Sequence, residues 1–288
     1  MPHTTADGPK IYYEASGDPA HEPIVLLEGF SAQLIGWRKG FVDRLGAEKL
    51  FVICPDNRDV GLSEKMGGPV ALTASYEAAD MAGDVCRVLE SLGLGSANIL
   101  GQSMGGVIAQ TMAIEHPEKA RSLVLLYTMP AYNDEFMNLE ALSRLSDTDW
   151  VGPATREENI EARVATVSAA LGQTEFPVDI DWVLELAELS FDRCYRPDGL
   201  ARQADMLRRS GDRRKALKTL AVPTSIIHGL RDGAVRPEAA ITLATLIQEA
   251  ELHLYAGMGH YVAEPLWDEF ASVIRRCVDR GVRARASR

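Results

Sequence analysis

Short apolar runs alternate with amphipathic segments of helix length along most of the chain. The apolar runs lie at residues 24–27, 50–54, 98–100, 123–127, 225–228 and 252–255. Because they are nearly unbroken, they predict buried strands of a parallel sheet that is covered on both faces. Helical periodicity is clearest at 76–92, 105–116, 238–249 and 265–280. This order predicts an α/β fold with a doubly wound, mostly parallel sheet.

The pattern changes after Met129-Pro130. Residues 131–217 show helical periodicity without a strand of comparable quality, with helical stretches at 139–145, 160–171, 182–191 and 200–209. In an open α/β sheet, ligands bind at the carboxyl ends of the strands. We therefore predict a core formed by residues 1–130 and 218–288, and a helical cap formed by residues 131–217.

The sharpest local motif is GQSMG at residues 101–105, between a predicted strand and a predicted helix. A serine between two glycines at such a junction fits a tight turn that raises its hydroxyl above the sheet. The backbone N–H groups at the N-terminus of the following helix can stabilise negative charge that develops during a reaction. Ser103 is the candidate nucleophile, and the alternative is a glycine-rich turn with an incidental serine.

A serine hydroxyl needs a base, and a histidine base needs a carboxylate that orients it. Of the six histidines, His260 lies in the glycine-rich loop GMGH directly after a predicted strand, while His228 reads as a packed polar residue. Asp232 follows the preceding predicted strand, and its alternative role is to cap a turn beside Gly233. The chain order Ser103, Asp232, His260 is the one expected of a single triad on this sheet.

These motifs, with the turn DNRDVGLS at 56–63, resemble the α/β-hydrolase superfamily of capped serine hydrolases. The resemblance covers most of the chain, and the 56–63 turn is similar to a branch that includes aclacinomycin methylesterase. It implies an oxyanion hole formed by the backbone N–H groups of Phe30 and Met104. The family usually has His-Gly after the first long strand, whereas this chain has Glu28-Gly29. A carboxylate there would repel an oxyanion, so we expect Glu28 to be turned away, paired with a cation such as Arg58, or protonated.

The predicted reaction is hydrolysis of a carboxylic ester through an acyl-enzyme on Ser103. Gly29, Trp37, Met129 and Met258 are candidate pocket residues, and the apolar ones favour a small, largely apolar substrate. The same fold resembles lactonases, thioesterases, carbon–carbon bond hydrolases and cofactor-free perhydrolases. A small-molecule receptor on this fold is the alternative that is not an enzyme.

Composition narrows the partners. The 288 residues are 46% hydrophobic with a net charge of -11, which favours a folded domain and disfavours nucleic acid. The four cysteines lack a C-x-x-C pair, so we expect reduced thiols, and no motif indicates a metal or an organic cofactor. Without a signal peptide or a membrane-length apolar stretch, we expect a cytoplasmic protein that does not bind membranes. The expected partner is a small-molecule substrate, and a homodimer is left open.

Overall fold

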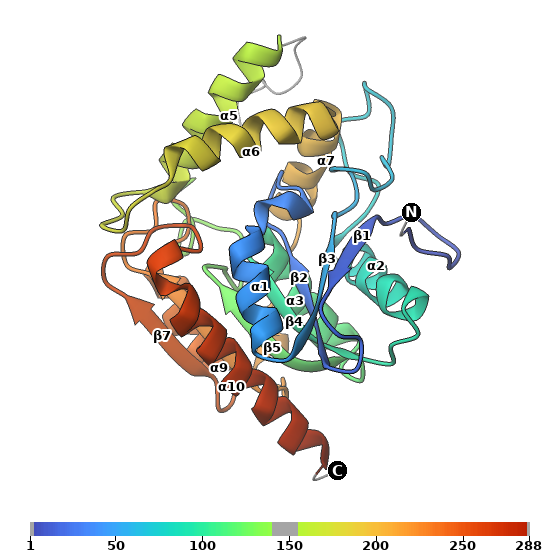
Figure 1. The fold of residues 1–288 in the computed structure, drawn as a ribbon, viewed down its shortest axis with the longest axis vertical. Helices are drawn as coiled ribbons and strands as arrows, with labels where there is room; N and C mark the ends of the chain where they lie inside the picture. Colours follow the sequence, from blue (N-terminus) through green and yellow to red (C-terminus); the bar gives the residue numbers. More distant parts are fainter. Residues whose placement is uncertain (1–2, 140–154, 287–288) are drawn as a thin grey trace.

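The central sheet is built on the alternation of apolar runs and helices. The computed structural model describes residues 3–139 and 155–286. Within them, seven strands pair in the order β1-β3-β2-β4-β5-β6-β7, with β1 antiparallel and the others parallel (Figure 1). The strands are β1 (Tyr13–Ser16), β2 (Glu22–Leu27), β3 (Leu50–Pro55), β4 (Ala97–Gln102), β5 (Ala120–Leu126), β6 (Thr224–Gly229) and β7 (Glu251–Tyr255). The predicted fold class is confirmed.

Helices cover both faces of the sheet because successive strand side chains point to opposite sides. Val25 and Leu27 face the cluster that includes α2 (Ala78–Ser91), α3 (Met104–Glu115) and α9 (Pro237–Leu246). Ile24 and Leu26 face the cluster that includes α1 (Lys39–Ala47) and α10 (Trp267–Ala286). With both faces buried, the strands need apolar residues at consecutive positions, which explains the unbroken runs in the sequence.

Two elements of the core have no counterpart in the sequence prediction. The short edge strand β1 has mostly exposed side chains, so it lacks the apolar run that marked the other strands. Helix α1 buries only Phe41 and Leu45, which is too few apolar positions for a strong helical period.

Between β5 and β6 the described chain is mainly helical. We call the helices of this block the cap helices, and the assignment of residues 131–217 as a cap over the substrate site stays a prediction. This block contains α5 (Arg156–Leu171), α6 (Ile180–Arg193), α7 (Pro197–Arg208) and α8 (Arg214–Leu217), and α5 and α6 lie at one end of the molecule (Figure 1). Most of the predicted helical stretch 139–145 falls outside the described residues. The end of α5 contacts the loops after β6 and β7, since the Gly233 N–H donates to Ala170 O at 3.2 Å and the Glu175 N–H donates to Gly257 O at 2.8 Å. Among the described residues, no helix has the length and apolar character needed to span a bilayer.

Candidate active site

Ser103 occupies a strained turn between β4 and α3. Its φ of 52° and ψ of -117° lie in a region that non-glycine residues rarely adopt, at a cost on the order of 1–3 kcal/mol. Its backbone is fixed from two sides, because its N–H donates to Leu126 O at 3.0 Å and its carbonyl accepts from Thr128 Oγ1 at 2.6 Å. These two hydrogen bonds hold Ser103 in a backbone conformation that it would not keep in an isolated turn.

The two glycines of the motif are required by close backbone contacts. A Cβ atom on Gly101 would collide with the carbonyl of Gly105, and one on Gly105 would collide with the carbonyl of Leu27. Strand, turn and helix therefore approach each other more closely than any side chain permits. The G-x-S-x-G motif thus has glycine at the two positions where the backbone leaves no room for a Cβ atom.

The loop after β2 lies directly beside Ser103. A Cβ built on Gly29 would lie 3.4 Å from Ser103 Cβ and 4.0 Å from Ser103 Oγ. The strands β2 and β4 are neighbours, and the chain runs outward from them in both directions, which makes this the point where the strand order reverses. Hydrogen bonds from the N–H groups of Phe30 and Met104 to protein acceptors are absent among the described residues. Both are thus candidate oxyanion donors, and Met104 is the first residue of α3, where helices leave N–H groups unpaired.

His260 and Asp232 lie in contact on the loops after β7 and β6. His260 Nδ1 is 2.7 Å from Asp232 Oδ2, and the two side chains are 12% and 0% exposed. The other carboxylate oxygen accepts from the N–H groups of Ala234 and Val235, each at 2.8 Å. Because a carboxylate only accepts, Nδ1 carries the hydrogen in this contact and Nε2 keeps its lone pair. His260 can therefore accept a proton at Nε2.

His228 is buried beside this pair. Its Nε2 lies 3.0 Å from the Val235 carbonyl and 3.7 Å from Asp232 Oδ2. Burial lowers the pKa of His228, which favours the neutral ring. A neutral imidazole leaves the charge of Asp232 available to His260.

Glu28 is fully packed behind the loop that carries Gly29. Its Oε2 accepts from Gln102 Nε2 and from the Gly29 N–H, while its Oε1 has no partner in the described structure. Burial raises the pKa of Glu28 to about 8, and the hydrogen bond from Gln102 and the charge of Arg163 counteract this only in part. Of the three expectations, the geometry favours the protonated form at neutral pH.

The expected pairing of Glu28 with Arg58 is wrong. Arg58 instead forms a bidentate ion pair with Asp84, at 2.6 and 2.8 Å, and lies over the ring of Tyr76. The reason is that α2 brings Asp84 beneath the 56–63 turn, a tertiary contact that the local motif does not encode.

Tyr127 is a site residue that the sequence analysis did not single out. Its ring centroid lies 4.6 Å from that of His260, and its hydroxyl donates to Gln102 Oε1. The contacts from His260 through Tyr127 and Gln102 thus reach Glu28. The available signal was a tyrosine ending an otherwise aliphatic strand, and its φ of 34° marks a constrained position.

Three of the four candidate pocket residues belong to the two hydrophobic clusters of the core. Trp37 and Met258 are buried in the cluster with α1 and α10, where Trp37 stacks on Phe41, and Met129 is buried in the opposite cluster. None of the four lines the cavity described next, and their assignment to a substrate pocket stays a prediction. Of the four, Gly29 is the one that lies against Ser103.

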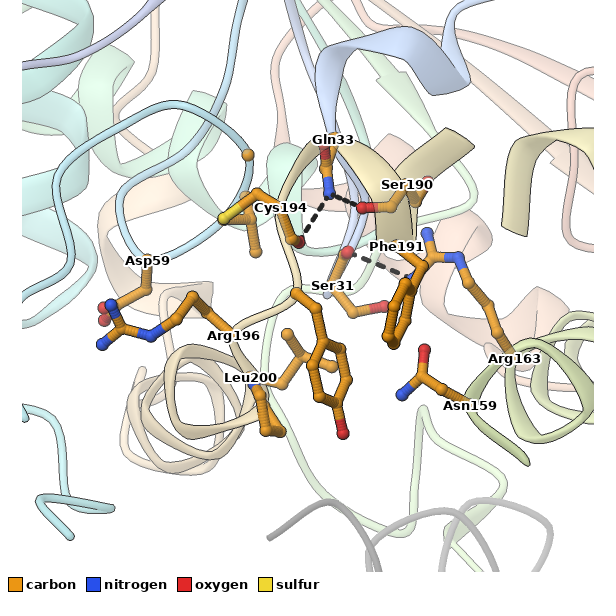
Figure 2. A pocket seen from close by; sticks show the side chains of 14 residues that line it. Ser31, Gln33, Asp59, Asn159, Arg163, Ser190, Phe191, Cys194, Arg196 and Leu200 are labelled. Atoms are coloured by element: carbon orange, nitrogen blue, oxygen red, sulfur yellow. Dashed lines mark hydrogen bonds between the residues drawn. The ribbon is translucent and has the colours of Figure 1, made fainter. Parts of the chain in front are cut away.

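A small cavity of about 40 Å³, open to solvent, lies between the helices that follow β5 and the core loops (Figure 2). Core residues Ser31, Gln33 and Asp59 line it together with Asn159 and Arg163 of α5. Ser103 is not part of its lining. Ser31, one of its lining residues, is two residues beyond Gly29 in the sequence.

The 56–63 turn attaches the cap to the core. Asp56 accepts from the N–H groups of Leu34 and Leu62, each at 2.8 Å, and pairs with Arg193 of the cap at 2.7 Å. Asp59 pairs with the buried Arg202 of α7 at 2.7 Å. These charges have partners within the protein, which indicates a structural role for the motif.

The described residues contain no group of three or more His, Cys, Asp or Glu side chains able to hold a metal ion. The four cysteines are free thiols.

This arrangement defines a hydrolase-type α/β protein, with a serine on a strained strand-to-helix turn and a histidine–carboxylate pair on later loops. Residues 22–264 match the α/β hydrolase fold family, and the chain belongs to that family.

Three similar proteins illustrate its range. The chain is 32% identical over 122 residues to rhodomycin D methylesterase DauP of Streptomyces sp. (strain C5), covering 42% of this chain and 40% of that protein. It is 28% identical over 263 residues to a 2-hydroxymuconate semialdehyde hydrolase of Pseudomonas sp. (strain CF600), covering 88% and 85%. The enol-lactonase from Burkholderia xenovorans LB400 has the same fold, with a TM-score of 0.76 and 21% identity over 96% of this chain and all of that chain. The match to the methylesterase thus spans less than half of its length, and the relatives named here act on different bonds.

Proposed function

We propose that this protein is a serine hydrolase that cleaves a carboxylic ester through an acyl-enzyme intermediate. The observation that carries the proposal is the 2.7 Å contact between His260 Nδ1 and Asp232, on loops at the sheet edge that also carries the strained Ser103. The chain partly matches DauP, which is named a methylesterase. This match favours an ester as the bond that is cleaved.

In this mechanism Ser103 Oγ attacks the ester carbonyl while His260 Nε2 takes its proton. The N–H groups of Phe30 and Met104 stabilise the oxyanion, and His260 returns the proton to the leaving alcohol. A water molecule deprotonated by His260 then attacks the acyl-enzyme and releases the acid. Asp232 keeps the proton on Nδ1 and stabilises the imidazolium.

Active-site labelling together with ester turnover tests this proposal. A fluorophosphonate should label Ser103 in the wild-type protein and leave the Ser103→Ala variant unlabelled, and p-nitrophenyl esters should be hydrolysed by the wild type. Label on a different serine would contradict the assignment of the nucleophile. Labelling without turnover of esters, lactones or thioesters would favour the receptor alternative.

Carbon–carbon bond hydrolysis is the second candidate, because the match to the 2-hydroxymuconate semialdehyde hydrolase spans 88% of this chain, cap included. The two reactions are separated by comparing kcat/KM for that semialdehyde with kcat/KM for simple esters. A preference for the semialdehyde that is lost in Ser103→Ala would replace the ester assignment.

A further inference from the structure

Arg163 of α5 forms no ion pair with the described part of the chain. It lines the cavity beneath the cap, and its Nη1 donates to the carbonyl of Ser31 at a long 3.4 Å (Figure 2). Within residues 3–139 and 155–286, this is its only hydrogen bond, and no carboxylate lies within 4.0 Å of its guanidinium. Most of its N–H donors are therefore without a partner among the described residues.

The other charges around the cavity are already compensated. Asp59 is paired with Arg202 at 2.7 Å, and Arg196 is paired with Asp198 at 2.8 Å. Glu28, whose charge would favour the protonated form of Arg163, has a pKa of about 8 and is mostly neutral at pH 7. Among the described residues that line the cavity, Arg163 is thus the one charged side chain without an oppositely charged partner, and desolvation makes its charge costly, as its lowered pKa shows.

The position of Arg163 relates it to the reaction centre. Ser31, its acceptor, lies two residues beyond Gly29, and two Cα–Cα steps span at most about 8 Å. Gly29 in turn lies against Ser103. Asn159, one helical turn earlier on α5, lines the same cavity and adds an amide to this face.

We propose that Arg163 and Asn159 form a subsite for a carboxylate carried by the substrate, several bonds away from the scissile carbonyl. This inference rests on the proposed function and narrows its substrates to esters with an anionic end. A guanidinium binds a carboxylate through two parallel hydrogen bonds, and the partly desolvated cavity strengthens them.

Matched pairs of esters test the subsite. p-Nitrophenyl monoesters of six-, eight- and ten-carbon dicarboxylic acids are compared with the p-nitrophenyl esters of the monocarboxylic acids of equal length. For the wild type we expect kcat/KM to favour the charged ester of at least one pair by about 10-fold or more. Arg163→Gln should lower that ratio by roughly 10- to 100-fold, mainly through KM, and Arg163→Lys should retain part of it.

The control is Arg156→Gln on the same helix, because Arg156 is partly exposed and already paired with Asp192 at 2.8 Å. It should leave the ratio between charged and neutral esters unchanged. A wild-type ratio near one at all three lengths would overturn the proposal. So would an Arg163→Gln variant that loses activity on both esters of each pair alike, because that result indicates a structural role.

Binding to the Ser103→Ala protein separates this inference from the proposed function. Calorimetry should show octanedioate binding more tightly than octanoate, and the Arg163→Gln change should remove the difference. This outcome supports the subsite even if no ester is turned over, in which case only the ester assignment fails. Equal binding of both acids would refute the subsite even if esters are hydrolysed.

Discussion

Two arginines of the cap face the core in different electrostatic environments. Arg202 of α7 is 1% exposed and donates to Asp59 at 2.7 and 3.0 Å and to Asp198 at 2.9 Å. Arg163 of α5 is half-buried and contacts a single carbonyl oxygen among the described residues. A buried charge with partners in the protein fixes structure, whereas one without partners is available to a ligand. The comparison divides the cap helices into a part that is anchored to the core and a part whose charge has no partner among the described residues.

The largest expected effect on activity is at Ser103, the proposed nucleophile. Ser103→Ala should lower kcat for p-nitrophenyl esters by at least ~10³, because it removes the covalent step and little packing. The thermal midpoint should stay nearly the same, since the strained backbone conformation remains and no buried contact is lost. Steady-state kinetics and thermal denaturation check the two halves, and a large fall in the midpoint would show that Ser103 supports the fold.

His260 and Asp232 should act as one unit. His260→Ala and Asp232→Ala should each lose most activity, and the double variant should be little worse than the poorer single one. The measurement is kcat for the three variants on one ester. Multiplicative losses would mean that the 2.7 Å contact between the two side chains does not matter for the reaction.

Removal of the buried charge of Arg202 should lower the stability of the fold. Arg202→Gln leaves the buried carboxylate of Asp59 without its cation, at a cost of about 3–5 kcal/mol in the free energy of unfolding. Denaturant unfolding measures this cost, with Arg156→Gln as a matched arginine on the surface of the cap. If Arg202→Gln changed stability no more than Arg156→Gln, the ion pairs would not be the anchor.

Glu28→Gln gives the smallest expected change in activity and a pH-dependent change in stability. Below about pH 4.5 the carboxyl is protonated in the folded and unfolded states, so variant and wild type should be equally stable in this respect. As pH rises toward about 8, only the unfolded state loses the proton, so the wild type loses stability that the variant keeps. The difference should be roughly 3 kcal/mol at pH 7.

The same variant tests how the charge of Glu28 affects catalysis at the loop after β2. At pH 7 its kcat should change by less than ~10-fold, because glutamine has the shape of the protonated acid. Above pH 8 the wild type acquires a negative charge beside Gly29 and should lose activity that the variant retains. Unfolding curves and kcat at several pH values check both parts, and a pH-independent difference in stability would show that folding does not raise the pKa of Glu28.

The sequence predicted those parts of the fold that depend on local repetition. Six strands and the helices after 76, 105, 238 and 265 followed from unbroken apolar runs and helical periods, because burial on both faces requires them. The GQSMG spacing followed from steric needs of one turn, and the structure shows the backbone contacts that exclude a Cβ at Gly101 and Gly105. The edge strand β1 and helix α1 were missed, because neither buries enough side chains to leave a pattern.

Tertiary structure decided which polar groups meet. Arg58 pairs with Asp84 and not with Glu28, and Tyr127 contacts His260, because sheet order and helix packing join segments that are far apart in sequence. The pKa of Glu28 depends on burial, which no local motif encodes. By itself, the sequence determined the α/β fold and the residue types available for catalysis. The structure decided the electrostatic state of each charged group, because that state depends on partners and desolvation that only the folded chain supplies.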